Sequence, residues 1–117
     1  MKIALNFRQE AAQSPEVEHE RSIERDVERC RRNDWEAKTR LVQAFMPLLT
    51  SLARKRAQES AGINRYIDAG KEGLIRATRH YKAADGLKFQ VFALDFIEKN
   101  MNRIDRPGLF SRLFGRS

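Results

Sequence analysis

The chain has 117 residues, the usual size of a single domain, and 41% of them are apolar, an ordinary share for a globular protein. No apolar run reaches the length of about 18 residues that a membrane-spanning helix needs. The single cysteine, Cys30, cannot form an internal disulfide and leaves no zinc site of the paired-cysteine kind. These features exclude wholesale disorder and a spanning segment, and they predict a soluble, cytoplasmic protein without a metal or cofactor.

The net charge of +7 is unevenly distributed along the chain. Residues 1–40 hold nine basic and nine acidic side chains, whereas residues 41–117 hold the other 14 basic and only seven acidic ones. A positive field confined to one part of a small domain attracts phosphate or an acidic protein surface. The charge alone does not distinguish these two partners.

The first 14 residues are predicted to be a flexible arm or an extended piece lying on the domain, because their strand-like alternation has no second strand nearby. Ser14-Pro15-Glu16 is typical of a helix start, with a capping oxygen, a proline at the first helical position and an early acid. The helix that follows, to about residue 32, has one narrow apolar seam at Ile23, Val27 and Cys30. We interpret its many charges as a solvated face and Cys30 as a buried structural thiol.

A second helix is predicted from about residue 34, because Asn33 and Glu36 have the spacing of a capping box. Pro47 should kink this helix rather than end it, because the apolar period continues beyond it, and Gly62 is interpreted as the stop. The core stripe of this helix is Leu41, Phe45, Leu48, Leu49 and Leu52.

A third helix is predicted with Asn64 as its cap. It contains Gly70 and Gly73, which each cost about 1 kcal/mol in a helix interior, so a neighbour is expected to approach its backbone closely. Residues 84–86 predict a turn, and a last helix is predicted over residues 88–104. The fold class is therefore all-α: one helical domain of about four helices over residues 15–106, followed by an apolar and basic tail at 107–117.

No arrangement of residues in the sequence indicates catalysis. His19 and His80 belong to no ligand pair at i, i+4, and His80 is interpreted as a polar residue at a helix end. Gly70-Lys71-Glu72-Gly73 lacks the spacing of a phosphate loop. We predict that the protein is not an enzyme.

Residues 67–77 read Ile-Asp-Ala-Gly-Lys-Glu-Gly-Leu-Ile-Arg-Ala. This segment is similar to the pattern D-L-I-Q-E-G-x-x-G-L-I-x-A of region 2 in bacterial sigma-70 family sigma factors. Residues 41–55, with Met-Pro-Leu-Leu at 46–49, resemble the first conserved helix of that region, and residues 80–93 resemble K-F-D…G-x-K-F-S-T-Y-A. Residues 26–37 resemble the approach helix of the smaller, extracytoplasmic-function sigma factors. The resemblance runs without gaps over about two thirds of the chain.

This resemblance implies a helical module for transcription initiation or its regulation, with two binding faces. The family docks on the clamp helices of the RNA polymerase core and captures single-stranded promoter DNA, flipping a base against aromatic rings. Carried over onto this chain, the polymerase-binding residues are Arg65, Asp68, Lys71, Glu72 and Arg76. The DNA-binding residues carried over are Lys88, Phe92, Phe96, Lys99 and Arg103.

The contact positions depart from the family pattern. Asp95 stands where the family often has tryptophan and Glu98 where it has arginine, and carboxylates repel DNA phosphate. The spacing of Phe92 and Phe96 also fits core packing. The chain ends at Ser117, which leaves no room for the separate helix-turn-helix domain, so a stand-alone region 2-like domain is expected.

Two alternatives therefore remain open beside the polymerase- and DNA-binding module. The first is a sigma mimic that binds an anti-sigma factor or another regulatory protein without contacting DNA. The second concerns the tail, whose apolar and basic residues suit an anionic membrane surface. Docking of the tail onto its own domain or onto a partner is favoured, because the tail offers little apolar area. We expect a membrane role to be the weakest of these.

Overall fold

The computed structural model describes residues 15–105, and within this range the chain forms four α-helices and one short 3-10 turn, with no strand. The elements are α2 (Pro15–Arg31), α3 (Trp35–Arg56), α4 (Ser60–His80), η1 (Ala83–Asp85) and α5 (Phe89–Asp105). The predicted all-α fold is confirmed. The predicted arm at 1–14 and tail at 107–117, together with residue 106, lie outside the described residues. No helix in the described part is long and apolar enough to cross a membrane.

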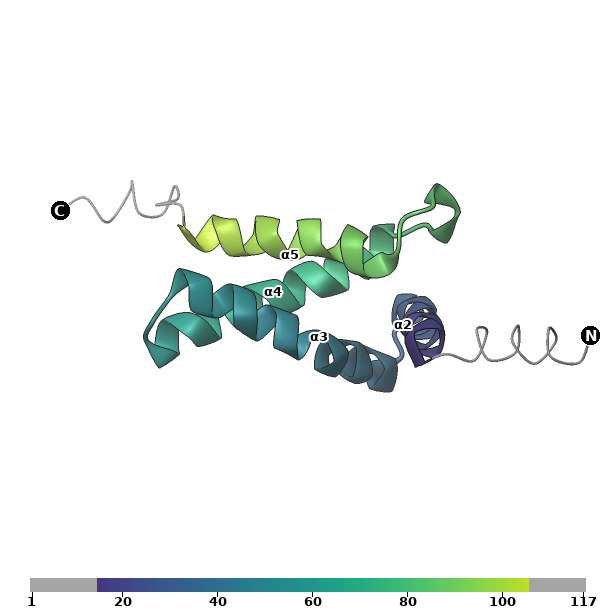
Figure 1. The fold of residues 1–117 in the computed structure, drawn as a ribbon, viewed down its shortest axis with the longest axis horizontal. Coiled ribbons are helices and arrows are strands. Elements are labelled where there is room, and N and C mark those ends of the chain that lie inside the picture. The colour runs from purple at the N-terminus through teal and green to yellow at the C-terminus, as the bar shows by residue number, and fades with distance from the viewer. Residues whose placement is uncertain (1–14, 106–117) are drawn as a thin grey trace, which may run out of the picture.

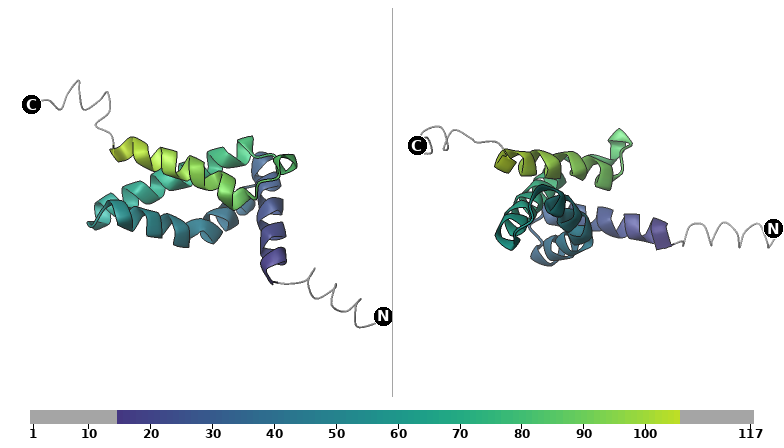
Figure 2. Two further views of the ribbon diagram at one scale, coloured as in Figure 1. Left: turned by 45° about the horizontal axis from the view of Figure 1, so that its top comes forward. Right: turned by 60° about the vertical axis from the view of Figure 1, so that its left-hand side comes forward.

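Helices α3, α4 and α5 pack side by side, and α2 crosses one end of them. α5 lies along α4, α3 packs against α4 from the other side, and α2 contacts α3 and α4 (Figure 1). Figure 2 shows α2 running across the start of α3, with its first turns extending away from the other helices. Glu20 of α2 nevertheless reaches the segment that leads into α5, because its carboxylate pairs with Lys88.

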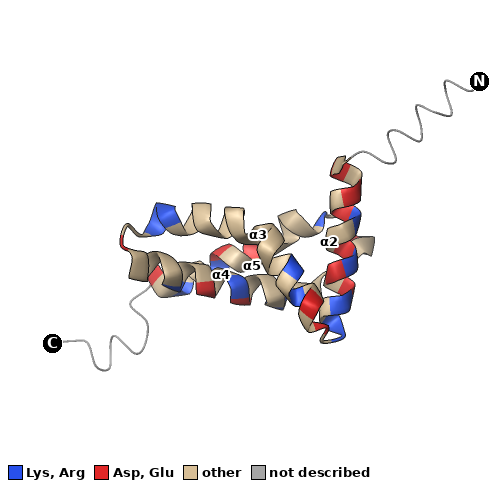
Figure 3. Cartoon of the chain, turned by 90° about the horizontal axis from the view of Figure 1, so that it is seen from below, with Lys and Arg blue, Asp and Glu red and all other residues tan. Residues whose placement is uncertain are grey.

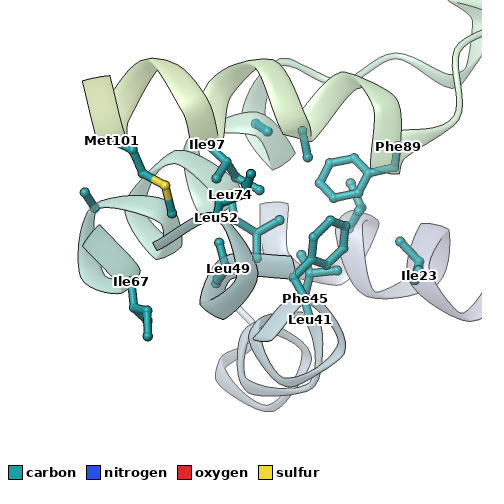
Figure 4. Packing of buried hydrophobic residues seen from close by; sticks show 14 of the residues in the cluster. Ile23, Leu41, Phe45, Leu49, Leu52, Ile67, Leu74, Phe89, Ile97 and Met101 are labelled. Atoms are coloured by element: carbon teal, nitrogen blue, oxygen red, sulfur yellow. The ribbon is translucent and has the colours of Figure 1, made fainter. Parts of the chain in front are cut away.

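The four helices share one apolar core, which lies where α3, α4 and α5 meet (Figure 4). Leu41, Leu49, Leu74 and Ile97 are completely buried there, and Phe45 and Phe89 meet edge to face with ring centroids 5.8 Å apart. α2 adds the predicted seam, since its buried apolar residues are Ile23, Val27 and Cys30. The predicted stripe of α3 is confirmed as well, with Leu48 only partly buried at its edge.

Gly73 and Gly70 mark the closest approach between α4 and its neighbours. A Cβ atom at Gly73 would lie 2.5 Å from the carbonyl oxygen of Phe96 and 2.9 Å from the Cα of Ile97. At Gly70 it would lie 2.7 Å from Leu49 Cδ2 and 2.8 Å from a methyl group of Met101. The prediction that these glycines permit close packing is confirmed, and at Gly73 the neighbour is the backbone of α5 itself.

Three predicted helix boundaries are wrong for local reasons. Asn33 does not cap α3: it has a φ of 64° and closes α2, donating its N–H to the Cys30 carbonyl at 3.0 Å. The cap is Asp34, whose Oδ1 accepts the N–H groups of Glu36 and Ala37 at 3.0 and 3.2 Å. Asparagine tolerates the left-handed conformation that ends helices, and the aspartate one residue later is as good a capping group.

The break between α3 and α4 falls earlier than predicted. α3 continues through Pro47, as predicted, but it ends at Arg56 with Ala57 in an extended conformation, so no glycine is needed at the stop. α4 already begins at Ser60, which places Gly62 in its first turn and Asn64 inside the helix. A Cβ at Gly62 would lie 3.0 Å from the Cβ of Ala57, a single tight contact where the chain turns back.

Candidate functional site

The five residues carried over as polymerase-binding form one stripe along the outer side of α4, called here the α4 stripe. Steps of three and four residues place Arg65, Asp68, Glu72 and Arg76 on the same side of the helix, where all four are exposed. Lys71 lies beside them, half-buried, with its Nζ 4.0 Å from Asp68 Oδ1. The structure therefore brings this set together as a surface of mixed charge.

One edge of the α4 stripe borders a hollow between α3 and α4. α4 contributes Lys71, Glu72, Ile75, Arg76 and Arg79, and α3 contributes Lys38 and Val42. Four cations thus surround a single carboxylate and two half-buried apolar side chains. The sequence analysis missed Lys38, Val42, Ile75 and Arg79. The spacing of four between Lys38 and Val42 was a signal that they share a side of α3, but their pairing with α4 depends on how the helices cross.

The other edge borders a hollow between α4 and α5. It is lined by Arg65, Asp68, Ala69, Glu72, Asn100, Arg103 and Ile104. The buried Asn100 side chain donates from Nδ2 to the Ala69 carbonyl at 3.2 Å, which fixes α5 against α4 at this place. Arg103, which the resemblance assigned to the DNA-binding set, therefore lies beside Arg65 and Asp68 of the α4 stripe.

The two candidate DNA-stacking rings belong to an aromatic cluster. Phe92 and Phe96 are half-buried, with ring centroids 5.1 Å apart. Phe92 meets Tyr81 at 5.4 Å, and Phe96 stacks on the ring of His80 at 5.6 Å with an interplanar angle of 16°. His80 is the last residue of α4, as the sequence predicted. Both phenylalanine rings already pack against other rings of this chain, so neither ring is fully free to stack on a base.

The two candidate DNA-binding lysines each form an ion pair within this chain. Lys88 Nζ lies 2.8 Å from Glu20 Oε1, and this hydrogen bond raises the pKa of the ammonium group above its ordinary value. Lys99 Nζ lies 3.0 Å from Asp95 Oδ2, one turn earlier on α5. The sequence analysis named Asp95 as a departure but gave no signal for Glu20, which is 68 residues away from its partner.

Buried and half-buried contacts fix the position of α2, and hence of Glu20. Arg40 of α3 holds the buried Asp26 with an Nη2–Oδ1 distance of 3.0 Å, and this bond raises the pKa of Arg40. Arg31 Nε donates to the Thr78 carbonyl at 2.7 Å, tying α2 to the end of α4. Burial raises the pKa of the Cys30 thiol, so it stays neutral as the structural interpretation required. Figure 3 shows how acidic and basic residues alternate along α2 while the middle of α3 carries no charge.

A polar network joins the end of α3, the first turns of α4 and the end of α5, far from the end that α2 crosses. The Tyr66 hydroxyl donates to Asp105, which raises the pKa of Tyr66, and Arg56 Nε lies 3.6 Å from the same carboxylate. Arg56 Nη2 also donates to Asn102 Oδ1 at 2.9 Å. This network holds the last turn of α5 against α3 and α4, and with it the position of Arg103.

The described residues contain no group of three or more histidine, cysteine, aspartate or glutamate side chains placed to hold a metal ion. Their functional features are surface charges and rings, which suit binding.

Comparison with known proteins gives one informative match. The chain is 30% identical over 79 residues to the RNA polymerase principal sigma factor HrdC of Streptomyces coelicolor. The chain carries a sigma-factor-like region. The match covers 68% of this chain but only 23% of that relative. No protein-family model matches the sequence, and no solved structure matches it.

Proposed function

We propose that this chain is a sigma factor region 2-like module that binds the RNA polymerase core and takes part in transcription initiation or its regulation. The observation that carries the proposal is the exposed α4 stripe, which lies in the segment resembling the family's polymerase-docking helix. The similarity to a principal sigma factor over 79 residues supports it. The proposal involves no catalytic step and no cofactor, and it places the chain in the cytoplasm, where polymerase works.

The charge of the α4 stripe suits docking on another protein. It alternates cations with carboxylates, and such a pattern fixes orientation and partner choice when it faces a complementary surface. The proposed partner is the pair of clamp helices of the polymerase core. The flanking hollows, one toward α3 and one toward α5, widen the area that such a partner can cover.

A pull-down with purified core polymerase tests this proposal. The wild-type chain is expected to be retained at low salt, and the double variant Lys71→Glu, Arg76→Glu should lower retention at least about tenfold, because it destroys the charge pattern that a complementary partner surface requires. The control is Arg21→Glu, Arg25→Glu, which makes the same charge change on α2. Absence of wild-type retention at low salt, or equal loss in both double variants, would contradict docking through α4.

A second candidate function is that of a sigma mimic, which binds an anti-sigma factor or another regulatory protein without contacting DNA. The ion pairs of Lys88 with Glu20 and of Lys99 with Asp95 favour it, because both lysines of the DNA-binding set already have carboxylate partners. Fluorescence anisotropy with single-stranded and duplex promoter DNA separates the two functions. Tight binding with a steep salt dependence supports the DNA role, and indifference to DNA supports the mimic.

A further inference from the structure

We propose that a second surface, formed by the start of α3 and the end of α4, binds an acidic amphipathic helix of a protein partner. We call it the α3–α4 surface and define it by Trp35, Lys38, Val42, Ile75 and Arg79. Lys71, Glu72 and Arg76 of the α4 stripe line the same hollow, but the five defining residues lie outside that stripe. The proposal therefore does not depend on polymerase binding.

Trp35 provides the apolar anchor of this surface. It is the only tryptophan in the chain, and it is 73% exposed although it begins a well-capped helix. Its carbonyl accepts a hydrogen bond from the Thr39 hydroxyl at 3.1 Å, so its backbone is held inside the first turn. Tryptophan is strongly enriched among the residues that dominate protein–protein binding energy, because it presents a large rigid area. An exposed tryptophan leaves a large apolar area in water, which is unfavourable unless a partner covers it.

Val42 lies two turns along α3 from Trp35, on the same side of the helix. Trp35, Lys38 and Val42 are spaced i, i+3 and i+7, which places them on one side of α3. Val42 and Ile75 are half-buried and lie together at the hollow between α3 and α4. The apolar part of the surface thus runs from an exposed aromatic ring to an aliphatic floor between two helices.

Three of the four cations around this floor have no carboxylate partner among the described residues, whereas the fourth, Lys71, lies 4.0 Å from Asp68 Oδ1. Among residues 15–105, Lys38, Arg76 and Arg79 form no ion pair, whereas Lys88 and Lys99 each do. Glu72 is the one acid among the residues that line the hollow. Desolvating several like charges is unfavourable unless the partner supplies the opposite charge. We therefore expect the partner of this surface to carry carboxylate or phosphate groups.

The side chains of Val42 and Ile75, which form the aliphatic floor of the hollow, favour a protein partner over a nucleic acid. An amphipathic helix presents apolar side chains at i, i+3 and i+4, flanked by polar ones, and lays them into a groove of this kind. Leucine-like side chains would occupy the floor at Val42 and Ile75, while flanking glutamates would meet Lys38 and Arg79. A phosphate backbone would satisfy the cations and stack a base on Trp35, but it would leave the floor without an apolar partner.

The emission of Trp35 reports directly on this binding, because no other tryptophan contributes. The probe is a synthetic, fluorescein-labelled helical peptide with leucines at i, i+3 and i+4 and glutamates on both flanks. Adding the unlabelled peptide to the full chain should shift the Trp35 emission to shorter wavelength in a saturable way. A matched peptide with lysine in place of every glutamate should not bind. An unchanged Trp35 emission, or equal binding of the two peptides, would overturn the proposal.

Fluorescence anisotropy of the labelled peptide then shows which residues of the surface contribute to binding. Lys38→Glu and Arg79→Glu should each weaken binding at least about tenfold, and Trp35→Ala by a similar factor. Arg25→Glu on α2 is the matched control and should leave affinity unchanged. A single-stranded oligonucleotide is the competing probe. If it binds more tightly than the acidic peptide and loses binding in the same variants, the surface is a nucleic-acid site and the proposal is wrong.

Discussion

The α3–α4 surface and the outer side of α5 carry similar basic residues but differ in how those residues are partnered. On the α3–α4 surface, Lys38 and Arg79 make no ion pair within the described part of the chain. On the side of α5, Lys88 and Lys99 hold Glu20 and Asp95 at 2.8 and 3.0 Å. The net charge of +7 describes the whole chain and does not distinguish free cations from paired ones. It indicates a binding function only once the carboxylate partners of the cations are located.

This difference bears on the choice between protein and DNA as the partner of each face. A cation that already holds a carboxylate must release it before it can neutralise a phosphate, so it adds less to DNA affinity. Exposed ion pairs are weak, however, and they lower the contribution of a lysine without abolishing it. The α5 side is therefore expected to bind DNA less well than its lysine content indicates.

The largest expected effect tests whether both regions depend on the same helix contact. Gly73→Ala places a methyl group 2.5 Å from the carbonyl oxygen of Phe96, in backbone that has no flexible side chain to move aside. We expect a loss of at least about 2 kcal/mol of unfolding free energy, which exceeds the gain in helix propensity of about 1 kcal/mol. Thermal unfolding should show a melting temperature lower by about 10 °C.

Gly62→Ala is the control for the gain in helix propensity. Its new methyl group would meet only the Cβ of Ala57 at 3.0 Å, near the start of α4, so a much smaller change is expected. If Gly73→Ala proves as stable as the wild type, α4 and α5 are not held in the close contact seen here. The two faces would then have to be considered as independently mobile.

The next effect separates the two regions, because it acts on the network that holds the end of α5 against α3 and α4, away from the α3–α4 surface. Tyr66→Phe removes the hydroxyl group that donates to Asp105 and should cost about 1 kcal/mol of unfolding free energy at neutral pH. The bond raises the pKa of Tyr66 above its ordinary value, so the unfolded tyrosine ionises first as pH rises. Its stabilisation is therefore complete below about pH 10 and is lost as pH rises through the folded-state value.

Urea unfolding at pH 7 and at about pH 10.5 checks this. The difference between wild type and Tyr66→Phe should be largest at pH 7 and should shrink at the higher pH. Peptide binding at the α3–α4 surface should be unchanged, because the Tyr66 network lies at the opposite ends of α3 and α4. A difference that grew with pH would show that the hydroxyl group is not stabilised in its protonated form.

The core of this fold could be predicted from the sequence because helical periodicity records it directly. Ile23 and Val27 were predicted to face inward from spacing alone, and Gly73 was predicted to meet a neighbour because a helix interior otherwise avoids glycine. Helix ends were predicted less well. Asn33 and Asp34 are adjacent and both suit a cap, so only the backbone conformation decides which of them ends α2 and which begins α3.

The surfaces could not be predicted in the same way, because they depend on contacts between distant segments. Val42 and Ile75 share a hollow only because α3 and α4 cross there. Glu20 reaches Lys88 only because α2 lies across the end of the other helices. Neither pairing leaves a periodic signal in the sequence. The residues that line each face follow from the fold, and their charges then decide what the face can bind.

The smallest expected effect tests whether the ion pair between Glu20 and Lys88 limits DNA binding on the α5 side. Glu20→Gln keeps the size of the side chain but removes the charge that holds Lys88, so Lys88 becomes available to a phosphate group. Affinity for single-stranded promoter DNA should rise a few-fold, and the plot of log affinity against log salt should steepen by about 0.7, the value for one added phosphate contact. Fluorescence anisotropy over a range of salt concentrations measures both quantities.

The control must separate the lost ion pair from the simple gain in net positive charge. Glu18→Gln makes the same charge change at an exposed position of α2, and no ion pair links Glu18 to α5 among the described residues. If the two variants raise DNA affinity equally, total charge governs binding and the pairing at Lys88 has no specific role. If only Glu20→Gln does so, and Lys88→Ala cancels the gain in that background, then α2 limits DNA binding on the α5 side. The acidic half of α2 would thus favour the partner of the α3–α4 surface over DNA, using one carboxylate that the fold places beside a lysine 68 residues away.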